Sequence, residues 1–267
     1  MLQSRFFAFV LVVILFAGCA TVPITGRRQL SFVPQSQLFT LSEEGYRQLI
    51  SESKLSDDPQ KMEMVVTAGK KIAQAAEEFM RENDMEEEIK NYEWEFNLIE
   101  DGATVNAFCM PGGKIAVYTG ILPVTQDETG LAVVLGHEVA HAIANHGGER
   151  MSHLLMVQLG ATGLSVAASQ HSEQTKQILL QAYGAGTNVG FILPYSRKHE
   201  LEADHIGLIL MARAGYNPKK AIPFWRRMDT MGGERPPEFL STHPEPAKRI
   251  EDIKKALPAA MKYYKKQ

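Results

Sequence analysis

The chain has 267 residues, of which 45% are hydrophobic and 22% are charged, which is typical of a globular protein with one sizeable core. Its formal net charge at pH 7 is −3. Nucleic-acid binding calls for a strong basic excess, so this charge argues against DNA-binding and RNA-binding classes, and we expect no nucleic-acid partner.

The first 18 residues have the pattern of a secretion signal. Arg5 precedes eleven apolar residues at 6–16, and small residues then lead to Cys19. Eleven residues fall short of the ~20 that a spanning helix needs, so a permanent membrane anchor is the less favoured interpretation. The small residues before Cys19 resemble the lipobox of bacterial lipoproteins, in which the cysteine receives a lipid. Phe16 departs from that pattern, which leaves simple cleavage and release as an alternative.

The lipobox resemblance implies a location for the protein. A lipid on Cys19 would anchor it at the membrane in the bacterial periplasm, and Ala20 after the cysteine points to the outer membrane. We therefore expect a lipoprotein signal peptide over 1–18, a tether over 19–40 and one folded domain over 41–267. With Cys19 modified, Cys109 has no disulfide partner, and we expect it to be a small buried residue.

The predicted domain combines helices with a few strands. Period-two alternation at 92–98 predicts a half-buried strand, and Pro111 with two glycines predicts a hairpin between 105–109 and 114–119. Helical spacing covers 41–54, 61–83, 127–145, two segments between 150 and 182, 197–213 and the tail after Pro244. This order predicts an α+β fold, mainly α, with a small antiparallel sheet or hairpin ahead of the helix at 127–145.

The helix at 127–145 carries the sequence HEVAH. His137 and His141 lie one turn apart on the same helix face, about 6 Å from each other at the backbone, where their rings can bind one zinc ion. Glu138 lies beside them. It can take a proton from a metal-bound water, which is the general-base role in H-E-x-x-H metallopeptidases.

A catalytic zinc takes three protein ligands and keeps one open position, so a third donor is needed. In SRKHELEAD, Glu200 and Asp204 share one face of the helix at 197–213. We predict that Glu200 is the third ligand and that Asp204 accepts the outer ring N–H of a metal-bound histidine. Glu202 is the second candidate ligand and Cys109 a third, and a solvated acidic face is the alternative interpretation.

These residues resemble the HtpX-like gluzincin metallopeptidases of peptidase family M48. The similarity extends to NAFCMPGGKIAVYTGIL ahead of the zinc helix, to STHPEPAKRI near the end and to the lipoprotein-like start. It therefore covers most of the chain and implies the secreted lipoprotein branch, with a zincin-like metallopeptidase domain over 41–267. It also implies one zinc ion held by His137, His141 and Glu200, with Glu138 as general base.

Two elements have more than one interpretation. The strand at 114–119 could be an edge strand that pairs with extended substrate, as in zincins, or ordinary sheet structure. His243 in STHPEP could cap a helix beginning at Pro244. Alternatively, His243 reaches the metal site, where it holds the open zinc position or hydrogen-bonds the tetrahedral intermediate as a catalytic residue.

The resemblance implies a zinc metalloendopeptidase of the bacterial envelope that degrades misfolded or misassembled proteins. Such proteins would be its substrates, and outer-membrane assembly machinery is a further expected partner. The alternative is a chaperone-like outer-membrane assembly factor with a latched, mostly inactive zinc site. The intact Glu138 favours turnover, because a binding protein needs no base beside its ligands.

Overall fold

The computed structural model describes residues 19–22, 25–162, 196–231, 238–243 and 246–265. The predicted signal peptide at 1–18 and the second helical segment predicted before residue 182 lie outside these residues. The helices are α2 (Gln35–Glu52), α3 (Pro59–Arg81), α4 (Glu86–Ile89), α5 (Leu122–Thr125), α6 (Glu128–Ile143), α7 (His146–Thr162), α9 (Arg197–Arg213), α10 (Ala221–Thr230), α11 (Glu238–Thr242) and α12 (Pro246–Ala260). The strands are β1 (Cys19–Thr21), β2 (Arg28–Leu30), β3 (Glu95–Ile99), β4 (Ala107–Met110) and β5 (Lys114–Tyr118).

A small mixed sheet confirms the α+β prediction. Its order is β3-β5-β4, with β4 and β5 antiparallel and β3 and β5 parallel. The predicted hairpin is present, and both Gly112 and Gly113 adopt a positive φ of 81° in its turn. The strand predicted at 92–98 is present as β3, but its parallel pairing with β5 was not predicted, because that pairing links distant segments. This pairing makes β5 the central strand, so of the two interpretations of residues 114–119 the edge strand is wrong and ordinary sheet structure is confirmed.

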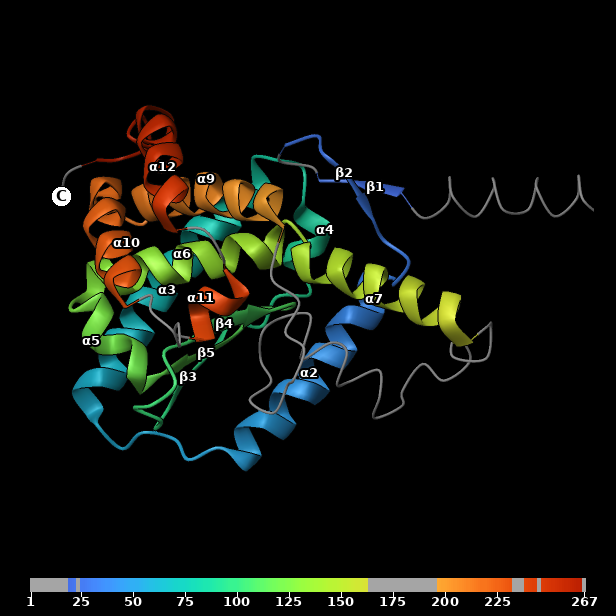
Figure 1. Cartoon of the computed structure of the whole chain (residues 1–267), viewed down its shortest axis with the longest axis horizontal. Coiled ribbons are helices and arrows are strands. Elements are labelled where there is room, and N and C mark those ends of the chain that lie inside the picture. Colours follow the sequence, from blue (N-terminus) through green and yellow to red (C-terminus); the bar gives the residue numbers. More distant parts are fainter. Residues whose placement is uncertain (1–18, 23–24, 163–195, 232–237, 244–245, 266–267) are drawn as a thin grey trace, which may run out of the picture.

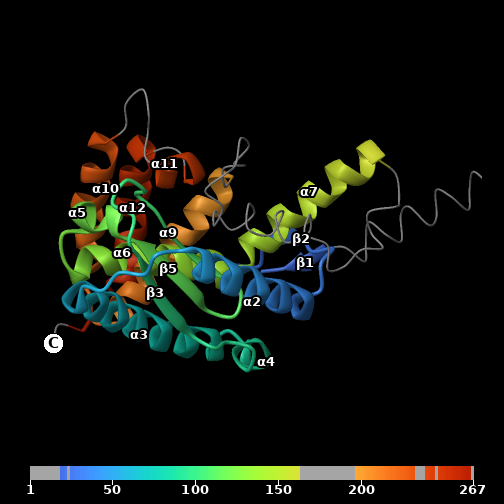
Figure 2. The same cartoon turned by 90° about the horizontal axis from the view of Figure 1, so that it is seen from below.

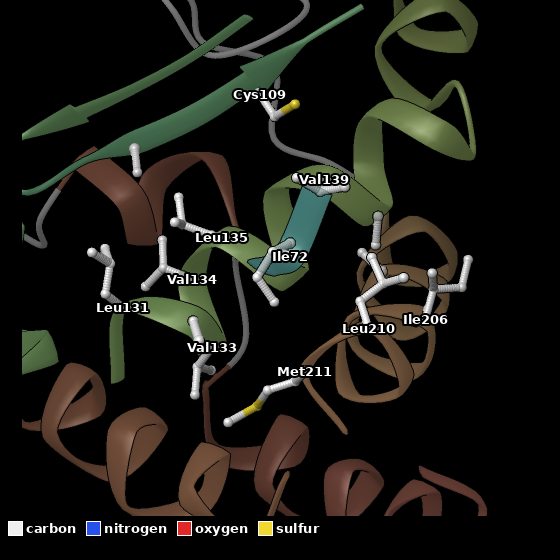
Figure 3. Packing of buried hydrophobic residues seen from close by; sticks show 14 of the residues in the cluster. Ile72, Cys109, Leu131, Val133, Val134, Leu135, Val139, Ile206, Leu210 and Met211 are labelled. Atoms are coloured by element: carbon white, nitrogen blue, oxygen red, sulfur yellow. The ribbon is translucent and has the colours of Figure 1, made fainter. Parts of the chain in front are cut away.

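Helix α6 lies at the centre of the molecule (Figures 1 and 2). It begins where the Asp127 side chain accepts a hydrogen bond from the Gly130 N–H at 2.7 Å, a standard N-cap. Every residue from Gly130 to Ile143 is buried, since α3, α9 and β4 pack around the helix. Figure 3 shows Val139 facing the buried Cys109, whose burial confirms the prediction, with Leu210 of α9 close by.

Helices α6 and α9 cross at two glycines. A Cβ atom on Gly136 would lie 2.9 Å from the Gly207 carbonyl oxygen, and one on Gly207 would lie 3.0 Å from the Gly136 backbone. The first distance is shorter than real Cβ contacts and the second is tighter than nearly all of them, so glycine at both positions lets the two backbones approach this closely. The crossing places His137, the neighbour of Gly136, opposite the acidic first half of α9. The bounds of α9 agree with the predicted helix at 197–213.

The N-terminal segment is more ordered than the predicted irregular tether. Strands β1 and β2 pair antiparallel, and α2 begins at Gln35, six residues before the predicted start at 41. Strand β2 lies against α7, whose C-terminal part extends away from the rest of the molecule (Figure 2). None of the described helices is long and apolar enough to cross a membrane.

The end of α6 also differs from the prediction. The helix was predicted to run to residue 145, but α6 ends at Ile143 and Asn145 adopts a positive φ of 56°. His146 then begins α7. The sharp turn at Asn145 therefore directs His146 back toward the end of α6.

Candidate metal centre

Four buried side chains converge near the middle of the molecule. His137 and His141 come from α6, Glu200 from α9, and His243 follows α11. One nitrogen or oxygen atom from each lies within 4.8 Å of the other three. The Nε2 atoms of His137 and His141 are 3.0 Å apart, as expected for two ligands separated by one helical turn.

The separations between these donor atoms suit zinc. Ligands about 2.0–2.1 Å from a tetrahedral zinc are separated by about 3.4 Å. The Glu200 carboxylate lies 3.4 Å from His137 Nε2, 3.3 Å from His141 Nε2 and 3.0 Å from His243 Nδ1. Three histidines and one carboxylate are also donor types that zinc prefers. The residues therefore fit one zinc ion, and Glu202 and Cys109 lie outside this donor set.

Asp204 and Arg249 lie behind His137 and Glu200. His137 Nδ1 is 3.0 Å from Asp204 Oδ1, in the place predicted for a carboxylate that orients a metal-bound histidine. Arg249 Nε donates to Asp204 at 2.7 Å, and another of its nitrogens donates to Glu200. Burial and Arg249 lower the pKa of His137, but Asp204 and Glu200 outweigh them and raise it to about 9.

Arg249 was missed by the sequence analysis, although it lies within the STHPEPAKRI segment. Its guanidinium carbon lies 3.8 Å from the centre of the buried Trp225 ring, a cation–π contact. The contacts of Arg249 with α9 depend on how α12 packs, and no local spacing rule connects residue 249 with residue 200. Sequence reasoning therefore had no signal for its role.

Glu138 is placed beside the donors without being one of them. Burial, together with the nearby Glu200, raises the pKa of its carboxyl to about 8. Its Oε1 atom lies 3.4 Å from His243 Nε2, and no described group gives that oxygen a well-aligned hydrogen bond. A buried carboxylate oxygen left in this state is available to a water molecule at the metal.

His243 reaches the donor group, whereas the helix start at Pro244 in the capping interpretation lies outside the described residues. Its Nδ1 atom lies 3.2 Å from His137 Nε2. The ring stacks on Phe239 of α11 with a centroid distance of 4.5 Å, which fixes its orientation. Burial lowers the pKa of His243 to about 4, so the ring is neutral at pH 7 and can offer a lone pair.

Glu202, the second candidate ligand, points away from the donors. It accepts a hydrogen bond from His146 Nε2 at 2.8 Å, while His146 Nδ1 lies 2.9 Å from His141 Nδ1. Glu202 also pairs with Arg27 of the N-terminal segment. Sequence reasoning missed His146, because a residue five positions after His141 does not share its helix face, and only the turn at Asn145 brings it back.

Comparison with known proteins agrees with this site. The profile of "Peptidase family M48" matches residues 67–257. Two similar proteins are named mitochondrial metalloendopeptidase OMA1. The Schizosaccharomyces pombe protein is 42% identical over 64% of this chain and 49% of its own length, and the Saccharomyces cerevisiae protein is 32% identical over 94% and 75%. The Escherichia coli K12 protein named beta-barrel assembly-enhancing protease is 27% identical over 90% of this chain and 48% of its own length.

These relatives correct the predicted location. A lipid-anchored protein of the bacterial periplasm and outer membrane was expected, whereas the two yeast relatives, at 42% and 32% identity, are mitochondrial proteins by name. The lipobox-like pattern is short and local, so it is weaker evidence than similarity across the folded chain. The lipid on Cys19 stays a prediction. The chain spans about half the length of the fission-yeast and bacterial relatives.

The family profile covers most of the chain, and the fold brings together the donor set that a zinc site of this kind needs. The HEVAH helix, the Glu200 carboxylate and the neighbouring Glu138 all lie inside the matched residues. This chain therefore belongs to peptidase family M48, whose metallopeptidases use zinc.

Proposed function

We propose that this protein is a metalloendopeptidase whose zinc is held by His137, His141 and Glu200, with Glu138 as general base. One observation carries the proposal. Three buried donors converge, and a carboxylate that is not a donor lies beside them with an oxygen that lacks a well-aligned hydrogen bond among the described residues. A purely structural zinc site has no need of such a base.

The peptide chemistry is divided between the metal and Glu138. Zinc bound at this site would lower the pKa of a water molecule and polarise the scissile carbonyl. Glu138 takes the proton of the attacking water and later returns it to the leaving amine. Its raised pKa suits both steps, because a carboxyl with a pKa nearer to neutrality can accept and release a proton at pH 7.

His243 gives the site a closed resting state in this proposal. Its Nδ1 atom lies 3.0 Å from Glu200 and 3.2 Å from His137 Nε2, which is where a fourth ligand would be. A catalytic zinc site keeps that position open for water. Turnover therefore requires the His243 ring to leave, and the same contact supports the second candidate function, a chaperone-like factor with a latched site.

The proposed substrates are misfolded or misassembled proteins. The name of the bacterial relative links that protein to β-barrel assembly, which supports a quality-control role for this chain.

The test is a comparison of the full-length protein with Glu138→Gln. Bound zinc and cleavage of unfolded casein are measured for both. We expect zinc in both proteins and cleavage by the wild type alone, with a loss of about 10²–10⁴-fold for a missing general base. Glu78→Gln, a change on the surface of α3, is the matched control and should cleave like the wild type.

Two results would contradict parts of the proposal. Equal cleavage by Glu138→Gln would remove Glu138 from the mechanism. Zinc in both proteins without cleavage by either would favour the latched, chaperone-like function. In that case His243→Ala is the next variant, because opening the fourth position should then release activity.

A further inference from the structure

A chain of contacts runs from His141 to the N-terminal segment. His141 Nδ1, the ring nitrogen on the side away from the other donors, lies 2.9 Å from His146 Nδ1. His146 Nε2 lies 2.8 Å from Glu202 Oε2, and Glu202 accepts a hydrogen bond from Arg27 Nε at 2.7 Å. The Thr25 hydroxyl also donates to Glu202.

The members of this chain are held firmly. His146 and Glu202 are buried, and the His146 ring stacks on His199 with a centroid distance of 4.5 Å and an interplanar angle of 18°. A second nitrogen of Arg27 lies 2.8 Å from Glu149, so two carboxylates fix the arginine. Arg27 lies between the paired strands β1 and β2, directly before β2. The chain of contacts therefore links this N-terminal hairpin to α6.

The chemistry of each group fixes the direction of every hydrogen bond. A carboxylate can only accept, so His146 Nε2 carries the hydrogen that is donated to Glu202. A neutral imidazole then has an unprotonated Nδ1, which accepts from the Nδ1–H of His141. His141 is left with its lone pair on Nε2, the atom 3.0 Å from His137 Nε2. That is the tautomer a metal ligand must have.

We infer that His146 and Glu202 are positioning residues that set the tautomer and orientation of the zinc ligand His141, and that Arg27 makes zinc retention depend on the N-terminal hairpin. This rests on the ligand set of the proposed function. In this arrangement each of the two α6 ligands is oriented by a carboxylate that an arginine holds. Asp204, bound by Arg249, contacts His137 directly. Glu202, bound by Arg27, acts on His141 through His146.

The experiment measures the zinc dissociation constant of the full-length protein by competition with a chromogenic chelator. His146→Phe keeps the ring volume and removes both hydrogen bonds, and we expect zinc to bind about 10–100-fold more weakly. Arg27→Gln should weaken binding in the same direction by a smaller factor. The visible spectrum of the Co²⁺-loaded variants should shift, because a reoriented His141 changes the geometry around the metal.

Two further variants serve as controls for the zinc measurement. His153→Phe is the matched control, since it makes the same exchange at an exposed histidine of the same helix, 4.0 Å from Glu149 Oε1 and outside the chain of contacts. It should bind zinc within about twofold of the wild type, even if its melting temperature falls. Asp204→Asn is the positive control and should weaken zinc binding about 10–100-fold by releasing His137.

The outcomes separate this inference from the proposed function. Wild-type zinc affinity and an unchanged Co²⁺ spectrum in both His146→Phe and Arg27→Gln, with weaker binding in Asp204→Asn, would overturn the inference alone. Unchanged affinity in Asp204→Asn as well would contradict the ligand set itself. Should His146→Phe fail to fold, Glu202→Gln and Arg27→Gln decide, because they leave the histidine rings in place.

Discussion

In the proposed function, the side chain of His243 decides whether the fourth position at the metal is closed or open. It lies 3.4 Å from the proposed base Glu138 and 3.0 Å from the ligand Glu200, so it contacts both parts of the catalytic machinery. A ring in that place excludes water from the fourth position. The same residue, once displaced, would be close enough to hydrogen-bond an oxyanion.

Replacing His243 by Ala is expected to separate these two roles. If holding the site closed dominates, cleavage of casein rises relative to the wild type. If stabilising the intermediate dominates, kcat falls by about 10²–10³-fold while zinc stays bound. Cleavage unchanged in both kcat and KM, in a variant with normal zinc content, would contradict a role for His243 at the metal.

The carboxylate of Glu202 makes the stability of the folded protein depend on pH, and its hydrogen-bond partners set the sign of that dependence. Burial raises the pKa of this group, but hydrogen bonds from His146, Thr25 and Arg27 outweigh burial and lower it to about 2. A carboxyl with a lowered folded-state pKa stabilises the protein above its unfolded pKa, near 4.5, and this stability is lost as the pH falls toward about 2.

We therefore expect the wild type to melt at a higher temperature than Glu202→Gln near neutral pH, and the difference to shrink below about pH 4.5. Melting curves of the zinc-free proteins between about pH 6 and pH 3 test this, since zinc-free samples remove the effect of acid on the metal. A difference that stays constant across the range would show that Glu202 is not ionised in the folded chain.

At the scale of elements, the crossing of α6 and α9 sets the distance between the metal donors. Gly136 precedes His137, and Gly207 lies two helical turns after Glu200. The close backbone approach at these glycines lets donors on both helices reach one point. Any side chain at the crossing would push the helices apart.

Gly136→Ala tests this geometry. The added Cβ would lie 2.9 Å from the Gly207 carbonyl oxygen. We expect a loss of about 1–3 kcal/mol of folding free energy from overpacking, together with weaker zinc binding. Chemical denaturation and chelator competition measure the two effects. Gly102→Ala is the control, because a Cβ there meets nothing within 4 Å. Equal stability and equal zinc affinity of the two variants would contradict the claim that the crossing sets the distance between the donors.

The elements also show what the sequence could and could not predict. The pairs His137 with His141 and Glu200 with Asp204 were predictable, because helical spacing is a local property. The bounds of α9 were predicted for the same reason. The central place of β5 depends on its pairing with β3, and the contacts of Arg249 and His146 depend on tertiary packing. These features have no periodic signal in the sequence.

For the whole molecule, the metal site joins segments that are far apart in the chain. Its donors come from α6, α9 and the residue after α11, and Arg249 of α12 completes the surroundings. A zinc ion at this point would bind only the folded chain. Binding of that kind adds RT ln(1 + [L]/Kd) to the stability, about 4 kcal/mol when zinc exceeds Kd by about 1,000-fold.

Removal of the metal should therefore lower the melting temperature. Dialysis against a chelator is expected to destabilise the wild type, and added zinc should restore it. His137→Ala supplies the control, because a protein without this ligand should melt at the same temperature before and after chelation. A wild type that melts identically with and without the chelator would mean that no metal supports the fold.

The most direct test of the central claim is the position of the metal in the purified full-length protein, measured by anomalous diffraction at the zinc edge. The account predicts one peak per chain, bonded to His137, His141 and Glu200. A chain without a peak, or with its zinc bound at His146 and His199, would contradict it.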